Sequence, residues 1–177
     1  MSTSLNGWPV LQPGSKQLAT GLVPGTTRKL TMRREVLPLF LALAHDYDDW
    51  IAPIDIGPID DAGYAYRYAR TGAGWSNHSS GTAADLNWSK EGAQRATNRT
   101  FWGRPKIAQS IDQIKAVYHV VDWGGDWSTQ YWDPMHWEIR RNVTLAEVAA
   151  RIKYLGITSK GVRHKDLNGH ELATART

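Results

Sequence analysis

The chain has 177 residues, which is enough for one domain with a substantial core and too short for two comfortable ones. It contains no cysteine, so disulfides and thiolate metal sites are excluded, and any bound metal must be held by His, Asp or Glu. The net charge of +4 is modest; it suits an anionic partner such as a bacterial wall, and it suits plain solubility equally well. Nine tryptophans against two phenylalanines are compatible with a cleft for sugars or peptides, and also with core packing.

The N-terminal part of the chain shows no targeting or membrane signal. No stretch approaches 18 apolar residues, so we expect no membrane insertion. The first residues lack a basic region followed by an apolar one, which predicts a protein made in a cytoplasm without a secretory signal peptide. Residues 1–30 are rich in Gly, Pro, Ser and Thr and predict an irregular leader that packs on the domain through Trp8, Val10 and Leu11.

A first helix is predicted from about Met32 to Tyr47, with Thr31 as its N-cap and an apolar stripe on one face. Pro38 argues against this helix, because proline beyond the first turn removes a hydrogen bond. His45, late in the helix, is interpreted as a surface group or a favourable C-terminal charge.

Alternating small and aromatic residues predict a strand over 62–68, which carries Arg67. A loop follows at 71–74, and then the segment 75–88, whose end again alternates like a strand. Residues 89–101 are polar and predict a surface excursion.

Two further helices are marked more clearly. One runs from about Pro105 to Val120, with proline in its first turn; its buried face is formed by Ile107, Ile111, Ile114, Val117 and Tyr118. His119, beside that face, is interpreted as a packed or capping histidine.

The other helix, over 144–155, begins with the capping box Thr144 and Glu147 and ends at Gly156. We predict that its buried face is formed by Leu145, Val148, Ala149, Ile152 and Leu155. Residues 157–177 read as a polar, basic tail, so the predicted catalytic domain covers 31–156.

His78 and Asp85 lie seven residues apart, with small residues between them that allow a tight turn. His136, on a predicted strand, completes a set of two imidazoles and one carboxylate, which is a common ligand set for catalytic zinc. Asp133 is the candidate general base from the preceding turn; Glu138, two residues beyond His136 on the same face of the strand, is the alternative. Arg67 is a candidate for stabilising developing negative charge.

The letters around these residues form two ordered motifs. Ser76-x-His78-x-x-Gly81-x-Ala83-x-Asp85 is followed, roughly fifty residues later, by Asp133-Pro-Met-His136-Trp-Glu138, with Trp-Gly-Gly-Asp-Trp at 123–127 between them. This pattern resembles the zinc peptidases that cut peptidoglycan stem peptides: the D-Ala-D-Ala carboxypeptidases and dipeptidases and the L-alanyl-D-glutamate endopeptidases of phage lysins. The resemblance covers about Gly63 to Ile139.

The resemblance implies that His78, Asp85 and His136 bind Zn²⁺ and that Asp133, ahead of Glu138, is the general base. It implies an α+β fold, with a small antiparallel sheet carrying the zinc and helices packed against it, of the hedgehog-like kind. Ser76, Asp126 and Trp137 are expected to contact substrate. Arg67 matches the family's arginine loosely, and Arg70, three residues on, remains an alternative.

The WGGDW block looks most like the L-alanyl-D-glutamate endopeptidase branch, which suggests a monomeric phage endolysin that reaches the stem peptide after release through a holin pore. Two alternatives stay open: a D-Ala-D-Ala carboxypeptidase or dipeptidase, and a non-catalytic zinc-containing wall-binding module. Nucleic-acid binding is not supported, because the basic residues are dispersed and no known motif is present.

Overall fold

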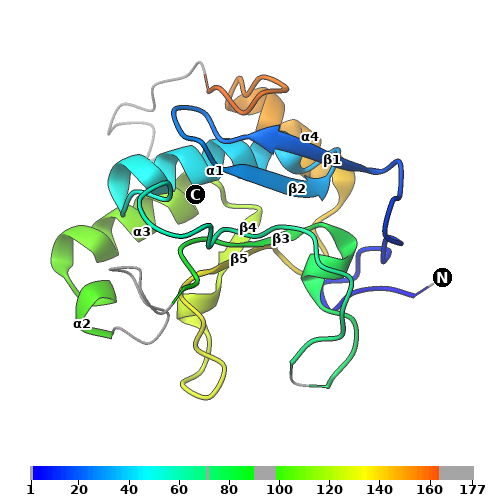
Figure 1. Cartoon of the computed structure of the whole chain (residues 1–177), viewed down its shortest axis with the longest axis horizontal. Helices are drawn as coiled ribbons and strands as arrows, with labels where there is room; N and C mark the ends of the chain where they lie inside the picture. The colour runs from blue at the N-terminus through cyan, green and yellow to red at the C-terminus, as the bar shows by residue number, and fades with distance from the viewer. Residues whose placement is uncertain (1, 71, 90–98, 164–177) are drawn as a thin grey trace.

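A computed structural model of the chain describes residues 2–70, 72–89 and 99–163. They form an α+β domain with two small antiparallel sheets and helices packed against them, which confirms the predicted fold class. Two loops at the bottom of Figure 1, coloured teal and yellow, project from this body and border the candidate site. Within the described residues, no helix combines the length and apolarity needed to cross a membrane.

The first sheet is a hairpin of β1 (Leu18–Leu22) and β2 (Lys29–Arg33). Leu30 and Met32 of β2 are fully buried, whereas Thr31 between them is half-buried, as expected of a strand with one face on the core. The predicted irregular leader is therefore wrong for residues 18–22 and 29–30. Strands of five residues give a weak local signal, and these are stabilised by pairing with each other and by contact with the following helix.

The helix α1 (Leu37–Trp50) begins later than predicted, because the residues up to Arg33 belong to β2. Pro38 consequently lies in the first turn, where a backbone N–H has no intrahelical partner to lose. Pro38 thus argued correctly against a helix that begins at Met32, and it is compatible with one that begins at Leu37.

The second sheet has three antiparallel strands in the order β3 (Ala83–Asp85), β5 (His136–Ile139), β4 (Val121–Trp123). In the β3–β5 register, Asp85 lies opposite His136. Side chains alternate along β5, so His136 and Glu138 share one face while Trp137 and Ile139 share the other. The second face is the core, because Trp137 and Ile139 have no exposed surface.

Helices complete the core around this sheet. They are α2 (Arg99–Trp102), α3 (Pro105–Val117) and α4 (Leu145–Tyr154), and α1 contacts both α3 and α4. The apolar residues predicted for the buried face of α3 are all buried. The capping box of α4 is confirmed: Thr144 Oγ1 accepts from Glu147 N, and Glu147 accepts from Thr144 N.

Three other predictions need correction. Residues 62–68 form single bridges, Ala62 with Asp85 and Tyr68 with Trp75, and do not form a regular strand. On α4, Leu145 and Ala149 are exposed, while Arg151 is buried and donates to the carbonyl oxygen of Val117. In the predicted surface excursion, residues 99–102 form α2 with two buried aromatic side chains, and residues 90–98 lie outside the described residues.

The stretch 157–163 packs on the domain instead of leaving it as a tail. A Cβ placed on Gly161 would lie 2.3 Å from Leu41 Cβ of α1, so the chain passes directly against that helix. Arg163 forms an ion pair of 3.3 Å with the buried Asp46. The ordered domain thus extends beyond residue 156; residues 164–177 of the predicted tail lie outside the described part.

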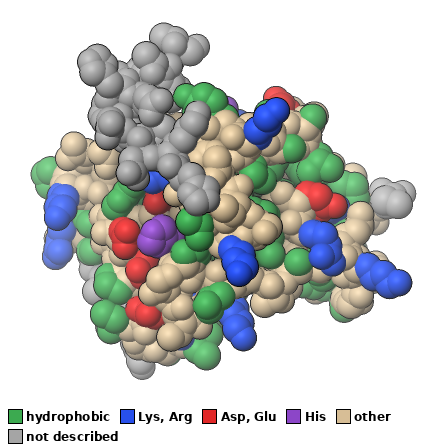
Figure 2. All heavy atoms as spheres, turned by 90° about the horizontal axis from the view of Figure 1, so that it is seen from above, with side chains coloured by type: hydrophobic (Ala, Val, Ile, Leu, Met, Phe, Trp, Pro, Cys, Tyr) green, Lys and Arg blue, Asp and Glu red, His purple; other side chains and the backbone are tan. Residues whose placement is uncertain are grey.

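Positive charge is spread over the surface. On the face shown in Figure 2, Lys and Arg side chains are separated by neutral and hydrophobic ones and do not gather into one stripe. Some arginines are paired with carboxylates: Arg28 pairs with the buried Asp61, and Arg140 pairs with Asp122 on the surface.

Candidate metal centre

Strand pairing brings Asp85 and His136 together from positions 51 residues apart. They are directly opposite each other on β3 and β5 and face away from the core. His136 Nδ1 lies 2.8 Å from Asp85 Oδ1. The sequence motifs supplied these two residues, and the antiparallel register makes them neighbours.

His78 reaches the same point from a short 3-10 helix, η1 (Asn77–Ser80). Ser76 caps this turn, because its hydroxyl accepts from the backbone N–H of His78 at 3.3 Å. Gly81 ends it in a left-handed conformation with φ of 70°, and a Cβ there would lie 2.4 Å from Arg33 N. The turn therefore leads straight into β3 with His78 directed at Asp85, and the two side chains approach to 3.3 Å.

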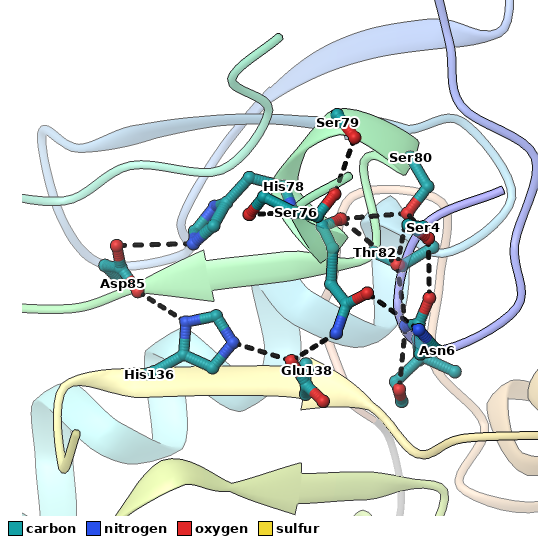
Figure 3. A network of polar contacts seen from close by, with 12 residues as sticks. Ser4, Asn6, Ser76, His78, Ser79, Ser80, Thr82, Asp85, His136 and Glu138 are labelled. Atoms are coloured by element: carbon teal, nitrogen blue, oxygen red, sulfur yellow. Dashed lines mark hydrogen bonds and ion pairs between the residues drawn. The ribbon is translucent and has the colours of Figure 1, made fainter. Parts of the chain in front are cut away.

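The three predicted ligands thus converge. One potential ligand atom from each of His78, Asp85 and His136 lies within 4.8 Å of the other two, and all three residues are buried. Among the described residues, this is the one group of three or more such side chains that could hold a metal ion. Figure 3 shows both imidazoles directed at the Asp85 carboxylate.

Outer hydrogen bonds indicate which nitrogen of each imidazole faces the site. His78 Nδ1 lies 2.6 Å from the carbonyl oxygen of Gly63, which can only accept, so Nδ1 carries a proton and Nε2 is the nitrogen that faces the site. That Nε2 is buried and lies 3.3 Å from Asp85 Oδ2. On the other imidazole, His136 Nε2 lies 2.8 Å from Glu138 Oε2. Two buried imidazole nitrogens directed at one carboxylate form a donor set that fits zinc.

The charges of the site favour a cation. Burial opposes ionisation of Asp85, but hydrogen bonds from His136 and His78 and their charges outweigh it and lower the Asp85 pKa. Burial likewise opposes protonation of His136, yet its hydrogen bonds to Asp85 and Glu138 raise its pKa to about 10. The carboxylates thus stabilise positive charge on the imidazoles. A divalent cation at the same point would be stabilised in the same way.

An open cleft of about 420 Å³ leads to these residues. One wall comes from the loop before η1 and carries Arg67 and Arg70. The opposite wall comes from the loop before β5 and carries the aromatic side chains of Trp127, Tyr131 and Trp132. The cleft therefore combines positive charge and aromatic surface around a polar floor, which suits an extended anionic peptide.

Asp133 lines the same cleft, three residues before His136. Its backbone N–H donates to Gly124 O at 3.0 Å, and a Cβ on Gly124 would lie 2.2 Å from Asp133 O, so glycine permits this close approach. Burial raises the pKa of Asp133; the nearby His136 lowers it, and the negative charge of Asp85 raises it again. A carboxylate with a raised pKa, close to a candidate metal site, has the properties of a general base.

Both candidate arginines lie on the cleft wall. Arg67 is half-buried, with Nη1 donating to Tyr68 O at 3.4 Å, whereas Arg70 is exposed and its positive charge lowers the pKa of Asp133. The assignment of the functional role to Arg67 stays a prediction, since Arg70 is equally part of the cleft.

The predicted substrate contacts have mixed outcomes. Ser76 lines the cleft, and its hydroxyl is engaged in capping η1, so its contact with substrate stays a prediction. Trp137 was wrongly predicted to contact substrate: it has no exposed surface and packs beside Trp123 on the core face of β5. Asp126 does not line the cleft and forms an ion pair with Lys115 on α3.

The histidines interpreted as structural lie away from the cleft. His45 pairs with Asp49 one turn along α1 at 3.7 Å, consistent with a surface group. His119 is exposed after α3, where partial burial and the charges of Arg151 and Arg140 lower its pKa. Neither contributes to the candidate metal centre.

Residues 69–139 match the family model described as D-alanyl-D-alanine carboxypeptidase. The matched stretch covers about two fifths of the chain and includes the three candidate ligands, Asp133 and Glu138. Proteins of this carboxypeptidase family are zinc peptidases of peptidoglycan, so the similarity indicates a metallopeptidase. Arg67, the hairpin and α1 lie outside the matched stretch. The searches of curated proteins and of solved structures returned no match.

Sequence reasoning missed two polar residues next to the centre. Asn77 donates to Glu138 Oε2 at 2.6 Å, and Asn6 donates its backbone N–H to Asn77 Oδ1 at 2.8 Å. The position of Asn77, immediately before His78, was a signal that could have been used. Asn6 carried no signal, because only the fold brings residues 71 positions apart into contact.

Proposed function

We propose that this chain is a zinc-dependent peptidoglycan peptidase that hydrolyses the amide bond between L-alanine and D-glutamate in the stem peptide. The observation that carries the proposal is the convergence of His78, Asp85 and His136 at the floor of a cleft that also contains Asp133. The similarity to D-alanyl-D-alanine carboxypeptidases supports the peptidase activity. The choice of bond rests on the resemblance of the WGGDW block to the endopeptidase branch.

Each of the cleft residues has a separate role in the proposed hydrolysis. Zinc held by the three ligands would polarise the scissile carbonyl and lower the pKa of a water molecule towards about 7. Asp133 takes the proton of the attacking water and returns it to the leaving amine, a role that suits its raised pKa. Arg67 or Arg70 supplies fixed positive charge for the carbonyl oxygen as it becomes negative, or for a carboxylate of the substrate.

We further propose that the protein acts as a monomeric phage endolysin, made in the host cytoplasm and admitted to the wall by a holin pore. The resemblance to phage lysins supports this context. Its substrate, the stem peptide, carries carboxylates that the arginine-bearing wall of the cleft can bind.

The test of the activity is wall clearing by purified, zinc-loaded protein. We expect turbidity of a cell-wall suspension to fall, and we expect both a chelator and the substitution His136→Ala to abolish clearing. Restored clearing on adding zinc to the chelated wild-type protein is the control for non-specific damage. Clearing that survives both treatments would refute the proposal.

Asp133→Asn tests the assignment of the base. The substitution preserves shape but removes the proton acceptor, so we expect kcat to fall by about 10²- to 10⁴-fold with zinc binding intact. Asp122→Asn is the matched control, because Asp122 lies on the surface in a pair with Arg140. Full activity of Asp133→Asn would transfer the role to Glu138.

The family description itself supports a second candidate, a D-Ala-D-Ala carboxypeptidase or dipeptidase. Mass spectrometry of digested muropeptides separates the two activities. The endopeptidase frees amino groups on D-glutamate, whereas the alternative releases D-alanine or its dipeptide. Sedimentation with walls without release of any peptide would instead identify a non-catalytic wall-binding module.

A further inference from the structure

A chain of hydrogen bonds links the N-terminal segment to the candidate metal centre (Figure 3). The backbone N–H of Asn6 lies 2.8 Å from Asn77 Oδ1, Asn77 Nδ2 lies 2.6 Å from Glu138 Oε2, and that same oxygen lies 2.8 Å from His136 Nε2. Asn6, Asn77 and His136 are buried and Glu138 is half-buried, so water competes weakly for these bonds. We call Asn6, Asn77 and Glu138 the relay.

The chemistry of the donors gives the relay a direction. A backbone N–H can only donate, so it requires the oxygen of the Asn77 amide to face Asn6. The amide nitrogen of Asn77 must then face Glu138, whose oxygen accepts from it. The same carboxylate oxygen accepts from Nε2–H of His136, so Nε2 can keep its proton when Nδ1, which here hydrogen-bonds to Asp85, gives up its own proton to bind a metal.

We propose that the relay residues are positioning residues that hold His136 in the tautomer and orientation required for Nδ1 to bind zinc. This inference deepens the proposed function and rests on its zinc site. It also gives Glu138 a role distinct from that of a base: its carboxylate is occupied by two donors and orients a ligand.

The N-terminal segment is built to hold the relay in place. Asn6 Nδ2 donates to Thr82 Oγ1 and to Ile139 O, each at 2.9 Å, which ties the segment to the end of β5. Ser4 Oγ donates to Asn6 Oδ1 at 2.8 Å and contacts Ser80 Oγ at 2.9 Å. A segment lying outside the family match therefore supports a ligand within it.

The experiment measures the zinc dissociation constant of the full-length protein by competition with a chromophoric chelator, without substrate. We expect Asn77→Ala and Glu138→Ala each to weaken zinc binding by about 10- to 100-fold, the usual cost of losing an outer partner of a ligand. Glu138→Gln retains an acceptor oxygen for His136 and should recover most of the affinity. In zinc-loaded wild-type protein, ¹⁵N NMR should show His136 protonated at Nε2.

Trp8→Phe is the matched control. Trp8 Nε1 donates to Val143 O at 3.1 Å, so the substitution loosens the same N-terminal segment without touching the relay, and zinc affinity should stay within twofold of the wild type. Folded Asn77→Ala with wild-type zinc affinity would overturn the proposal. If Asn77→Ala does not fold, equal zinc affinities of Glu138→Ala and Glu138→Gln would overturn it.

The outcome is separable from that of the proposed function. A wild-type protein that binds zinc but releases no peptide from walls refutes the peptidase proposal, while the affinities of the variants still decide the relay. A wild-type protein that binds no zinc refutes both.

Discussion

Replacing Trp137 by alanine tests the orientation of β5, on which the whole site depends. Trp137 follows the candidate ligand His136 directly but lies on the opposite face, with no exposed surface. Its ring centroid is 6.0 Å from that of Trp123. Removing a fully buried indole costs about 3–5 kcal/mol in the free energy of unfolding, from lost burial and from the cavity left behind.

For a chain of this length, 1 kcal/mol corresponds to a shift in Tm of about 2–4 °C, so we expect Trp137→Ala to lower Tm by roughly 6–20 °C. The assay is thermal unfolding of zinc-saturated protein followed by circular dichroism. Trp88→Ala is the matched control: Trp88 is 48% exposed, and the same change there should cost no more than about 1 kcal/mol. Below its Tm, Trp137→Ala should retain a KM close to the wild-type value. An unchanged Tm with a raised KM would refute the reasoning, because it would mean that Trp137 contacts substrate.

Two further predictions concern zinc and pH. Zinc at 1,000 times its dissociation constant should stabilise the protein by about 4 kcal/mol and raise Tm by roughly 8–16 °C over the chelated form, and calorimetry showing no shift would contradict a zinc site. Burial raises the pKa of Asp61 to about 6, so the stability that its protonated form contributes is present below pH 4 and is lost as pH rises through 6. The free energy of unfolding of Asp61→Asn, relative to that of the wild type, should therefore rise by on the order of 2 kcal/mol between pH 4 and pH 7. Denaturant unfolding of both proteins at the two pH values measures this rise. The same difference between variant and wild type at pH 4 and pH 7 would contradict the raised pKa of Asp61.

Local patterns were reliable where an element is defined by its own residues. The capping box at Thr144 and the proline at 105 located the starts of α4 and α3, because caps and first-turn prolines act through bonds within a few residues. The helix boundary at Met32 failed for the converse reason. Residues 29–33 become a strand by pairing with 18–22, a contact that no local periodicity reports.

The same distinction applies to the candidate site. The types and order of the candidate ligands could be predicted from the amino-acid sequence, because a zinc site without cysteine needs imidazoles and carboxylates, and the two motifs supply them at His78, Asp85 and His136. The sequence could not say which face of β5 is buried, and so it placed Trp137 in the cleft. Side chains alternate between the two faces of a strand whichever face is buried. Only packing against the helices decides which of the two sets of side chains lies in the core.

The groups that orient the candidate ligands could be identified only from the folded chain. Gly63 O orients His78, and Asn6 reaches His136 through Asn77 and Glu138, across more than a hundred residues of chain. Such partners need only a correctly placed donor or acceptor, often a backbone one, so no residue type marks them in advance. The physical reason is that a ligand's identity is local chemistry, whereas its orientation is set by whatever the fold brings beside it.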